Sequence, residues 1–118
     1  MMGVSALAAA LQLAAINWDA LPPLPYRAPP LITAEMQSFV AREARKCAKT
    51  AGTMQVDVAV LVDEAGGIRT TVPRAIQCAG VEQYVAALVG GFARSNLLPR
   101  IASSEQWYRT SLTFTLTK

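Results

Sequence analysis

A run of alternating valines constrains the fold more than any other feature of this chain. The segment 52–68 reads GTMQVDVAVLVDEAGGI, and a valine occupies every second position from Val56 to Val62. Because side chains alternate between the two faces of a strand, this pattern predicts a strand with one buried face. The next five residues are turn formers with two glycines, and Ile68 begins a second apolar run. The segment therefore predicts a β-hairpin.

A helix is expected before the hairpin. Thr33 is a suitable N-cap, and Glu35 in the first turn complements the helix dipole. Apolar side chains then recur at helical spacing and form one stripe: Met36, Phe39, Val40, Ala44 and Cys47. Gly52 is expected to end this helix.

A second helix and a last strand are expected after the hairpin. The return strand Ile68–Val72 is followed by Pro73, which ends it or marks a sheet edge. Helical spacing is clearest over 81–92, although Gly90 and Gly91 each weaken a helix by up to about 1 kcal/mol relative to alanine. The segment 107–117 alternates apolar and polar residues and predicts a terminal strand.

The predicted order is thus helix, hairpin, helix, strand. We expect an α+β fold, a two-layer sandwich in which two helices cover one apolar face of a three-stranded antiparallel sheet. The domain is placed at residues 33–118. The valine strand is expected at the front edge of the sheet, and the terminal strand is expected to expose an edge of its own.

Two segments precede this domain. Residues 1–15 resemble a signal peptide, because Val4–Ala15 is a mainly apolar run of 12 residues, which is too short to span a bilayer. A short buried helix and an uncleaved anchor are the alternatives. Residues 16–32 include five prolines between Asn17 and Pro30, a density that predicts an extended, stiff linker.

Composition excludes several function classes. The net charge of +3 with few aromatic residues is not a nucleic-acid footprint. The chain has no histidine, which removes His-dependent nucleophiles and His-ligated metals, so no metal or cofactor is expected. The remaining candidate groups of an enzyme show no acid–base spacing, so we expect no enzyme. These groups are Asp57, Asp63, Glu64, Glu82, Cys47 and Cys78.

The two cysteines admit three interpretations from the residues alone. Cys47 and Cys78 are not in a CxxC pair and are too few for a four-cysteine zinc site. They predict a single disulfide if the protein is exported, and two buried apolar side chains if it is not. A reactive thiol is the third possibility.

The hairpin and the segments after it resemble the C-terminal domain of the TonB and TolA proteins. The family has alternating valines and a V-D-x-x-G-x-V turn, which compares with Val62–Ile68 here, and then a helix and an amphipathic terminal strand. In TolA-like domains a disulfide links the N-terminal part to the second helix, which implies a Cys47–Cys78 bond. The resemblance also implies a periplasmic domain that binds an envelope protein, an outer-membrane receptor or a Tol-system component, by strand addition.

We therefore expect a non-catalytic periplasmic protein-binding domain, exported by its leader and contributing to envelope transport or energy coupling. The terminal strand would bind the partner through Trp107, Arg109, Ser111 and Thr113, and would also permit a homodimer. An ordinary surface role for Trp107 and Arg109 is the alternative. A secreted structural or inhibitor-like protein stabilised by its disulfide is the other function that the sequence allows.

Overall fold

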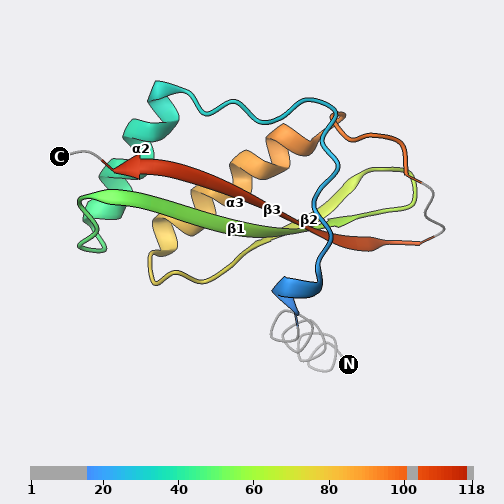
Figure 1. Cartoon of the computed structure of the whole chain (residues 1–118), viewed down its shortest axis with the longest axis horizontal. Helices are drawn as coiled ribbons and strands as arrows, with labels where there is room; N and C mark the ends of the chain where they lie inside the picture. The colour runs from blue at the N-terminus through green and yellow to red at the C-terminus, as the bar shows by residue number, and fades with distance from the viewer. Residues whose placement is uncertain (1–15, 101–103, 117–118) are drawn as a thin grey trace, which may run out of the picture.

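The computed structural model describes residues 16–100 and 104–116, so the leader expected over 1–15 lies outside the described residues. The element order confirms the predicted helix, hairpin, helix, strand, and a short 3-10 helix precedes them within the described residues (Figure 1). The elements are η1 (Trp18–Ala20), α2 (Ala34–Arg45), β1 (Gly52–Val62), β2 (Ile68–Pro73), α3 (Ala79–Ala93) and β3 (Gln106–Leu116). Within the described ranges, no helix is long and apolar enough to cross a membrane.

The valine strand β1 lies in the middle of the sheet. The strand order is β2-β1-β3, and both pairings are antiparallel. The expectation that β1 forms the front edge is therefore wrong. The alternating valines show that one face of β1 is buried, but this pattern is the same for a strand at the edge and a strand in the middle of a sheet. β1 pairs with β3 from Gly52 to Val62, and with β2 only from Val58 onward.

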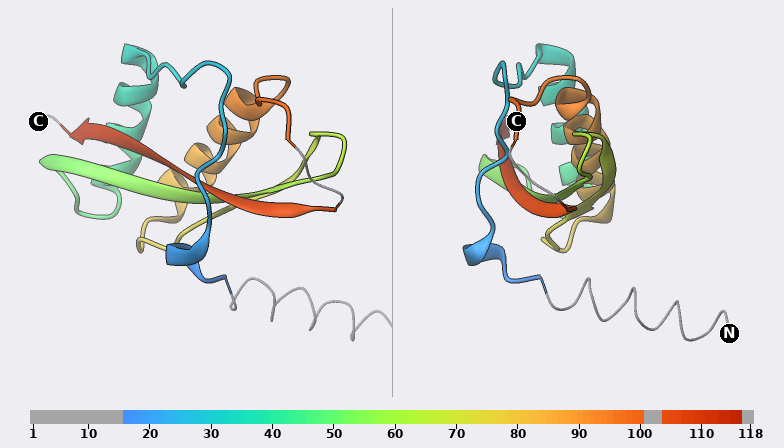
Figure 2. Two further views of the ribbon diagram at one scale, coloured as in Figure 1. Left: turned by 45° about the vertical axis from the view of Figure 1, so that its right-hand side comes forward. Right: turned by 90° about the vertical axis from the view of Figure 1, so that its right-hand side faces the viewer.

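Both helices cover one face of the sheet, as predicted, and the right-hand view of Figure 2 shows the two layers side by side. The four valines of β1 are fully buried under the helices, together with Phe114 of β3. Helix α3 contributes its own buried stripe to the same core: Val81, Val85, Ala86, Val89 and Ala93. The α+β sandwich is thus built on the apolar periodicities of the sequence.

Helix α2 begins as predicted and ends earlier than predicted. Thr33 accepts a hydrogen bond from the Met36 amide at 3.2 Å and so caps the helix. The helix ends at Arg45, and Ala48 takes the left-handed conformation with φ of 60°. Gly52, which was expected to end the helix, instead begins β1 with φ of +84°.

A disulfide joins the two helices. Cys47, just after α2, is bonded to Cys78, the residue before α3, with a Cα–Cα distance of 5.6 Å. The same two helices also meet where the Phe39 ring of α2 and the Tyr84 ring of α3 stack with their centroids 4.1 Å apart. The sequence interpretations of two reduced cysteines and of a reactive thiol do not apply.

The proline-rich segment packs against the sandwich and does not stand clear of it. Leu24 is only 6% exposed and belongs to the core cluster. Figures 1 and 2 show the segment crossing β3 on its way from η1 to α2. The chain forms no helix or strand between Pro22 and Pro30, as expected from the prolines, but Leu24 between them is nevertheless buried.

Candidate functional site

The outer edge of β3 is the first feature that could bind another chain. The chain's own proline-rich segment already pairs with this edge at one position. The Arg109 amide donates to the Pro22 carbonyl at 2.8 Å, and the Leu24 amide donates to the Arg109 carbonyl at 2.9 Å. Together these bonds form a parallel bridge between Pro23 and Arg109. The edge of β3 therefore accepts an extended segment in the observed structure.

A proline turn ends this pairing after a single bridge. In a parallel ladder, the Leu24 carbonyl and the Tyr26 amide would bond to Ser111 next. Instead, the Tyr26 amide donates to the Leu24 carbonyl at 2.9 Å, which closes a three-residue turn around Pro25. The two groups that could have extended the ladder bond to each other, so Ser111 is left unpaired by the segment.

A short stretch of the β3 edge consequently has no partner among residues 16–100 and 104–116. Because hydrogen bonding alternates along a strand, the backbone groups of Ser111 and Thr113 point outward like those of Arg109. At the far end, the Thr115 amide donates to Oε1 of Gln37 on α2 at 3.0 Å. The open stretch thus extends from Ser111 to the carbonyl of Thr115, between the proline-rich segment and α2.

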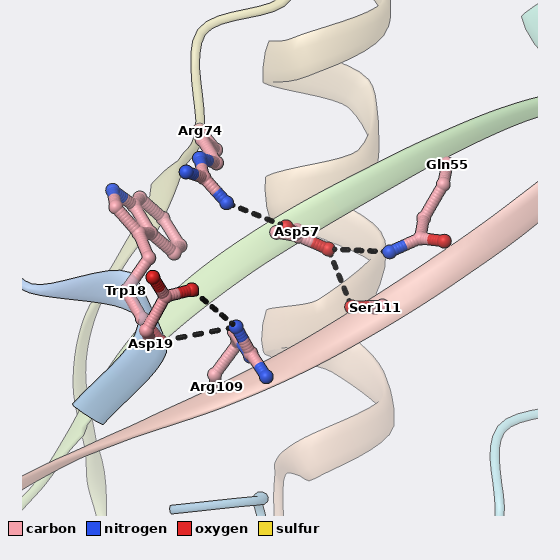
Figure 3. A network of polar contacts seen from close by, with 7 residues as sticks. All are labelled: Trp18, Asp19, Gln55, Asp57, Arg74, Arg109 and Ser111. Atoms are coloured by element: carbon pink, nitrogen blue, oxygen red, sulfur yellow. Dashed lines mark hydrogen bonds and ion pairs between the residues drawn. The ribbon is translucent and has the colours of Figure 1, made fainter. Parts of the chain in front are cut away.

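A polar cluster lies on the open face of the sheet beside this stretch (Figure 3). Asp57 of β1 accepts hydrogen bonds from Gln55 at 3.0 Å, from Ser111 at 2.5 Å and from Arg74 at 3.2 Å. Ser111 lies directly opposite Asp57 on β3. Partial burial acts to raise the pKa of Asp57. The three hydrogen bonds and the Arg74 charge outweigh that effect, so the pKa lies below its ordinary value.

The 3-10 helix η1 is attached to the same face. Arg109 donates to the Trp18 carbonyl at 3.0 Å, and its guanidinium lies 4.0 Å from the Asp19 carboxylate (Figure 3). The Arg74 guanidinium lies 5.4 Å from the centre of the Trp18 ring, within cation–π range. Arg74 thereby links the Asp57 cluster to η1.

Tyr26 holds the proline-rich segment on the other side of β3. Its hydroxyl accepts a hydrogen bond from Thr110 at 3.2 Å, and Tyr26 also forms an antiparallel bridge with Leu97. Burial raises the pKa of Tyr26, although the Thr110 hydrogen bond acts in the opposite direction. The segment therefore wraps around β3, from η1 on the open face to the loop after α3.

The four residues expected to bind a partner share one face of β3 but differ in their surroundings. Thr113 is exposed, and Trp107 is half-buried opposite Leu61 of β1. Arg109 is already engaged with η1, and Ser111 donates its hydroxyl to Asp57. The structure thus leaves Thr113 and the Ser111 backbone as the most accessible parts of this group.

The acidic residues considered for catalysis have structural partners. Asp63 accepts bonds from the Ala65 and Gly67 amides at 2.9 and 2.7 Å, and so stabilises the hairpin turn. Glu82 of α3 accepts hydrogen bonds from the amides of Ile76 and Cys78 at 3.1 and 3.0 Å, and both amides precede the first residue of α3. These contacts explain the two carboxylates as parts of the backbone structure.

Sequence reasoning missed the contribution of the proline-rich segment and of Gln37. The only signal for Leu24 was its residue type, because leucine is often buried, and Leu31 beside Pro30 in the same segment is 75% exposed. Gln37 carried no comparable signal, because its contact with Thr115 depends on how α2 crosses the end of β3.

Searches against protein-family models, curated proteins and solved structures returned no match for this chain. The likeness to the TonB and TolA C-terminal domains therefore stays a prediction based on the order of elements and on the turn motif.

Proposed function

We propose that this domain is a non-catalytic protein-binding module that adds an extended segment of its partner to the open edge of β3. The observation that carries the proposal is the bridge between Pro23 and Arg109, in which a segment of the chain itself pairs with that edge. An unpaired edge offers backbone donors and acceptors to any extended chain, and this is a recurrent mode of peptide recognition.

The open stretch limits what can bind. Ser111 and Thr113 supply two outward amides and two outward carbonyls, and the Thr115 carbonyl follows. A partner segment of about four to six residues fits this length, since a strand rises about 3.3 Å per residue. Specificity would come from the side chains beside the open stretch, of which Ser111 and Thr113 belong to β3. Trp107 lies beyond the bridge between Pro23 and Arg109 and does not border this stretch.

The cellular setting is part of the same proposal. The resemblance to the TonB and TolA domains and the leader-like residues 1–15 support export to the periplasm, and the Cys47–Cys78 disulfide suits an oxidising compartment. The partner would then be a cell-envelope protein, such as an outer-membrane receptor or a Tol-system component. A secreted structural or inhibitor-like protein is the second candidate, because the disulfide suits it equally well.

A proline substitution at the open edge tests the proposal. Thr113→Pro removes one outward amide without removing a bond to β1, and edge strands tolerate proline. Thr113→Val keeps that amide and is the matched control. The full chain would be used to capture partners from an envelope extract of its own organism, with circular dichroism to verify folding.

We expect Thr113→Pro to lose a partner that the wild type and Thr113→Val both retain. Equal capture by the folded proline variant would contradict strand addition at β3, and so would failure of the wild type to retain any envelope protein. Size-exclusion chromatography of the same variants tests the homodimer, because a dimer through β3 would become a monomer only in Thr113→Pro.

A further inference from the structure

The second edge of the sheet, β2, lies beside a groove that β3 does not share. The groove has a volume of about 720 Å³ and lies between β2, the β1–β2 turn, the end of α3 with its following loop, and Arg27 of the proline-rich segment. β2 is an outer strand of the sheet, so one side of its backbone has no partner strand in the part of the chain that the structure describes. A groove beside an unpaired backbone is suited to an extended peptide.

The register shows which backbone groups of β2 face outward. Arg74, the residue after β2, donates its amide to the Asp57 carbonyl at 2.8 Å. By alternation, the backbone of Val72 also bonds to β1, whereas that of Thr71 points away from it. Thr71 lines the groove. Pro73 takes an outward position, where its missing amide costs no bond to β1.

The charge of the groove is strongly one-sided. Its lining includes the three arginines Arg27, Arg94 and Arg100 and one acidic residue, Glu64, which leaves a net charge of +2. The carboxylate–guanidinium pairs found among the described residues involve Arg69, Arg74 and Arg109 instead. The groove therefore contains more positive charge than its own residues neutralise.

Two of these arginines are held in place by neutral groups. Arg100 donates to the Tyr108 hydroxyl at 2.8 Å and to the Asp63 carbonyl, and Arg27 donates to the Leu97 carbonyl at 3.3 Å. Neutral acceptors orient a guanidinium without cancelling its charge. Such arginines are already positioned for carboxylates, to which they bond more strongly than to neutral groups.

The walls of the groove also provide apolar contact. Leu98 is 48% exposed, and among the residues that the structure describes only Leu31 is another exposed large apolar side chain. Leu98 lines the groove together with Leu97. Gly90 of α3 also lines the groove and has no side chain above Thr71, where an added Cβ would lie 3.9 Å from the threonine methyl group. A peptide with alternating acidic and apolar side chains would match both kinds of contact.

We propose that this groove binds an acidic, extended peptide segment of a protein partner, paired with the outer edge of β2. This surface is separate from the β3 edge and does not depend on the function proposed for it. The occupant is a peptide because Thr71, whose backbone points away from β1, lines the groove. It is acidic because the excess charge of the groove is positive.

The test uses the full chain and a labelled eight-residue peptide of alternating glutamate and valine. A second peptide with glutamine in place of glutamate is the neutral probe. Binding would be measured by fluorescence anisotropy for the wild type and for the double variant Arg27→Gln/Arg94→Gln. The control is Arg42→Gln/Arg45→Gln, which removes the same charge from the exposed face of α2.

We expect the acidic peptide to bind at least tenfold more tightly than the neutral one, and the groove variant to weaken it by about fivefold or more. The α2 variant should change binding less than twofold. In an amide NMR spectrum, the acidic peptide should shift signals of β2 and of the end of α3, not those of Ser111 and Thr113.

Several results would overturn the proposal. Absence of binding, or equal binding of the two peptides, would exclude an acidic-peptide site. If both double variants weakened peptide binding equally, the acidic peptide would be attracted only by the net charge of the protein and not by the groove. Displacement of the peptide by free glutamate at the same carboxylate concentration would show a small-anion site. Shifts confined to β3 would assign the peptide to the other edge. None of these results would alter the outcome of the Thr113→Pro experiment.

Discussion

The disulfide allows the most quantitative prediction. Cys47 and Cys78 are separated by 31 positions in the sequence, and the loop they close contains the whole β1–β2 hairpin. Reduction would break this link and leave both sulfur atoms in place, so the packing of the core around Cys78 would change little. The experiment therefore isolates the effect of the cross-link from the effect of a cavity.

The magnitude follows from the entropy of the unfolded chain. For a loop of this length, the chain-entropy relation gives about 12 cal/mol/K, which corresponds to about 3.7 kcal/mol at 25 °C. A domain of this size is stable by about 5–10 kcal/mol, so reduction should remove a large part of its stability. With a urea m-value of about 1.2 kcal/mol/M, the unfolding midpoint should fall by about 3 M.

Urea titration with and without a phosphine reductant measures this shift, with the fluorescence of Trp18 and Trp107 as the signal. The double variant Cys47→Ala/Cys78→Ala is the control, because the reductant should not change its midpoint. A decrease of less than about 1 M on reduction of the wild type would refute the loop-entropy argument. It would mean that the unfolded chain gains little freedom when the link is cut.

Three further predictions concern stability. Gly91→Ala should stabilise the protein by about 0.5–1 kcal/mol, because an added Cβ meets no atom within 4 Å, whereas Gly52→Ala should destabilise it, because φ is +84° there. Leu24→Ala should cost about 2–3 kcal/mol if the proline-rich segment completes the core, and Leu31→Ala, at a 75% exposed site, should cost less than about 0.5 kcal/mol. The pKa of Asp57 is lowered in the folded state, so the ionised carboxylate stabilises the fold above about pH 4. This contribution is lost as the pH falls through the folded pKa. Asp57→Asn should therefore lose less stability on acidification than the wild type.

Thermal and urea unfolding measure all three. A destabilised Gly91→Ala would show that α3 needs flexibility at that turn. Equal effects of Leu24→Ala and Leu31→Ala would mean that the segment is detached in solution. Parallel stability–pH curves for Asp57→Asn and the wild type between pH 5 and 2.5 would show that the Asp57 cluster does not contribute to folding.

Much of the fold could be predicted from local patterns. The alternating valines predicted β1, the helical stripe predicted α3, and the residues from Trp107 onward predicted β3, because burial of one face imposes a period on the sequence. Thr33 marked the start of α2 through its capping hydrogen bond. These features depend on residues close together in the chain.

The candidate site could be predicted only in part. The sequence identified β3 as an edge strand, but it could not show that Pro22 and Leu24 occupy that edge at Arg109, or that Gln37 caps it at Thr115. The basic groove was not predicted, because its arginines come from three separate segments that meet only in the folded chain.

The sequence by itself determined which segments form helices and strands and which of their faces are buried, since periodicity follows directly from backbone geometry. Only the tertiary structure decided that β1 is the central strand, that the proline-rich segment is bound to β3, and which stretches of the two sheet edges stay open. The physical reason is that strand order and edge protection depend on backbone hydrogen bonds between distant segments. Every residue except proline offers the same backbone donor and acceptor, so the amino-acid sequence contains little information about which strands pair.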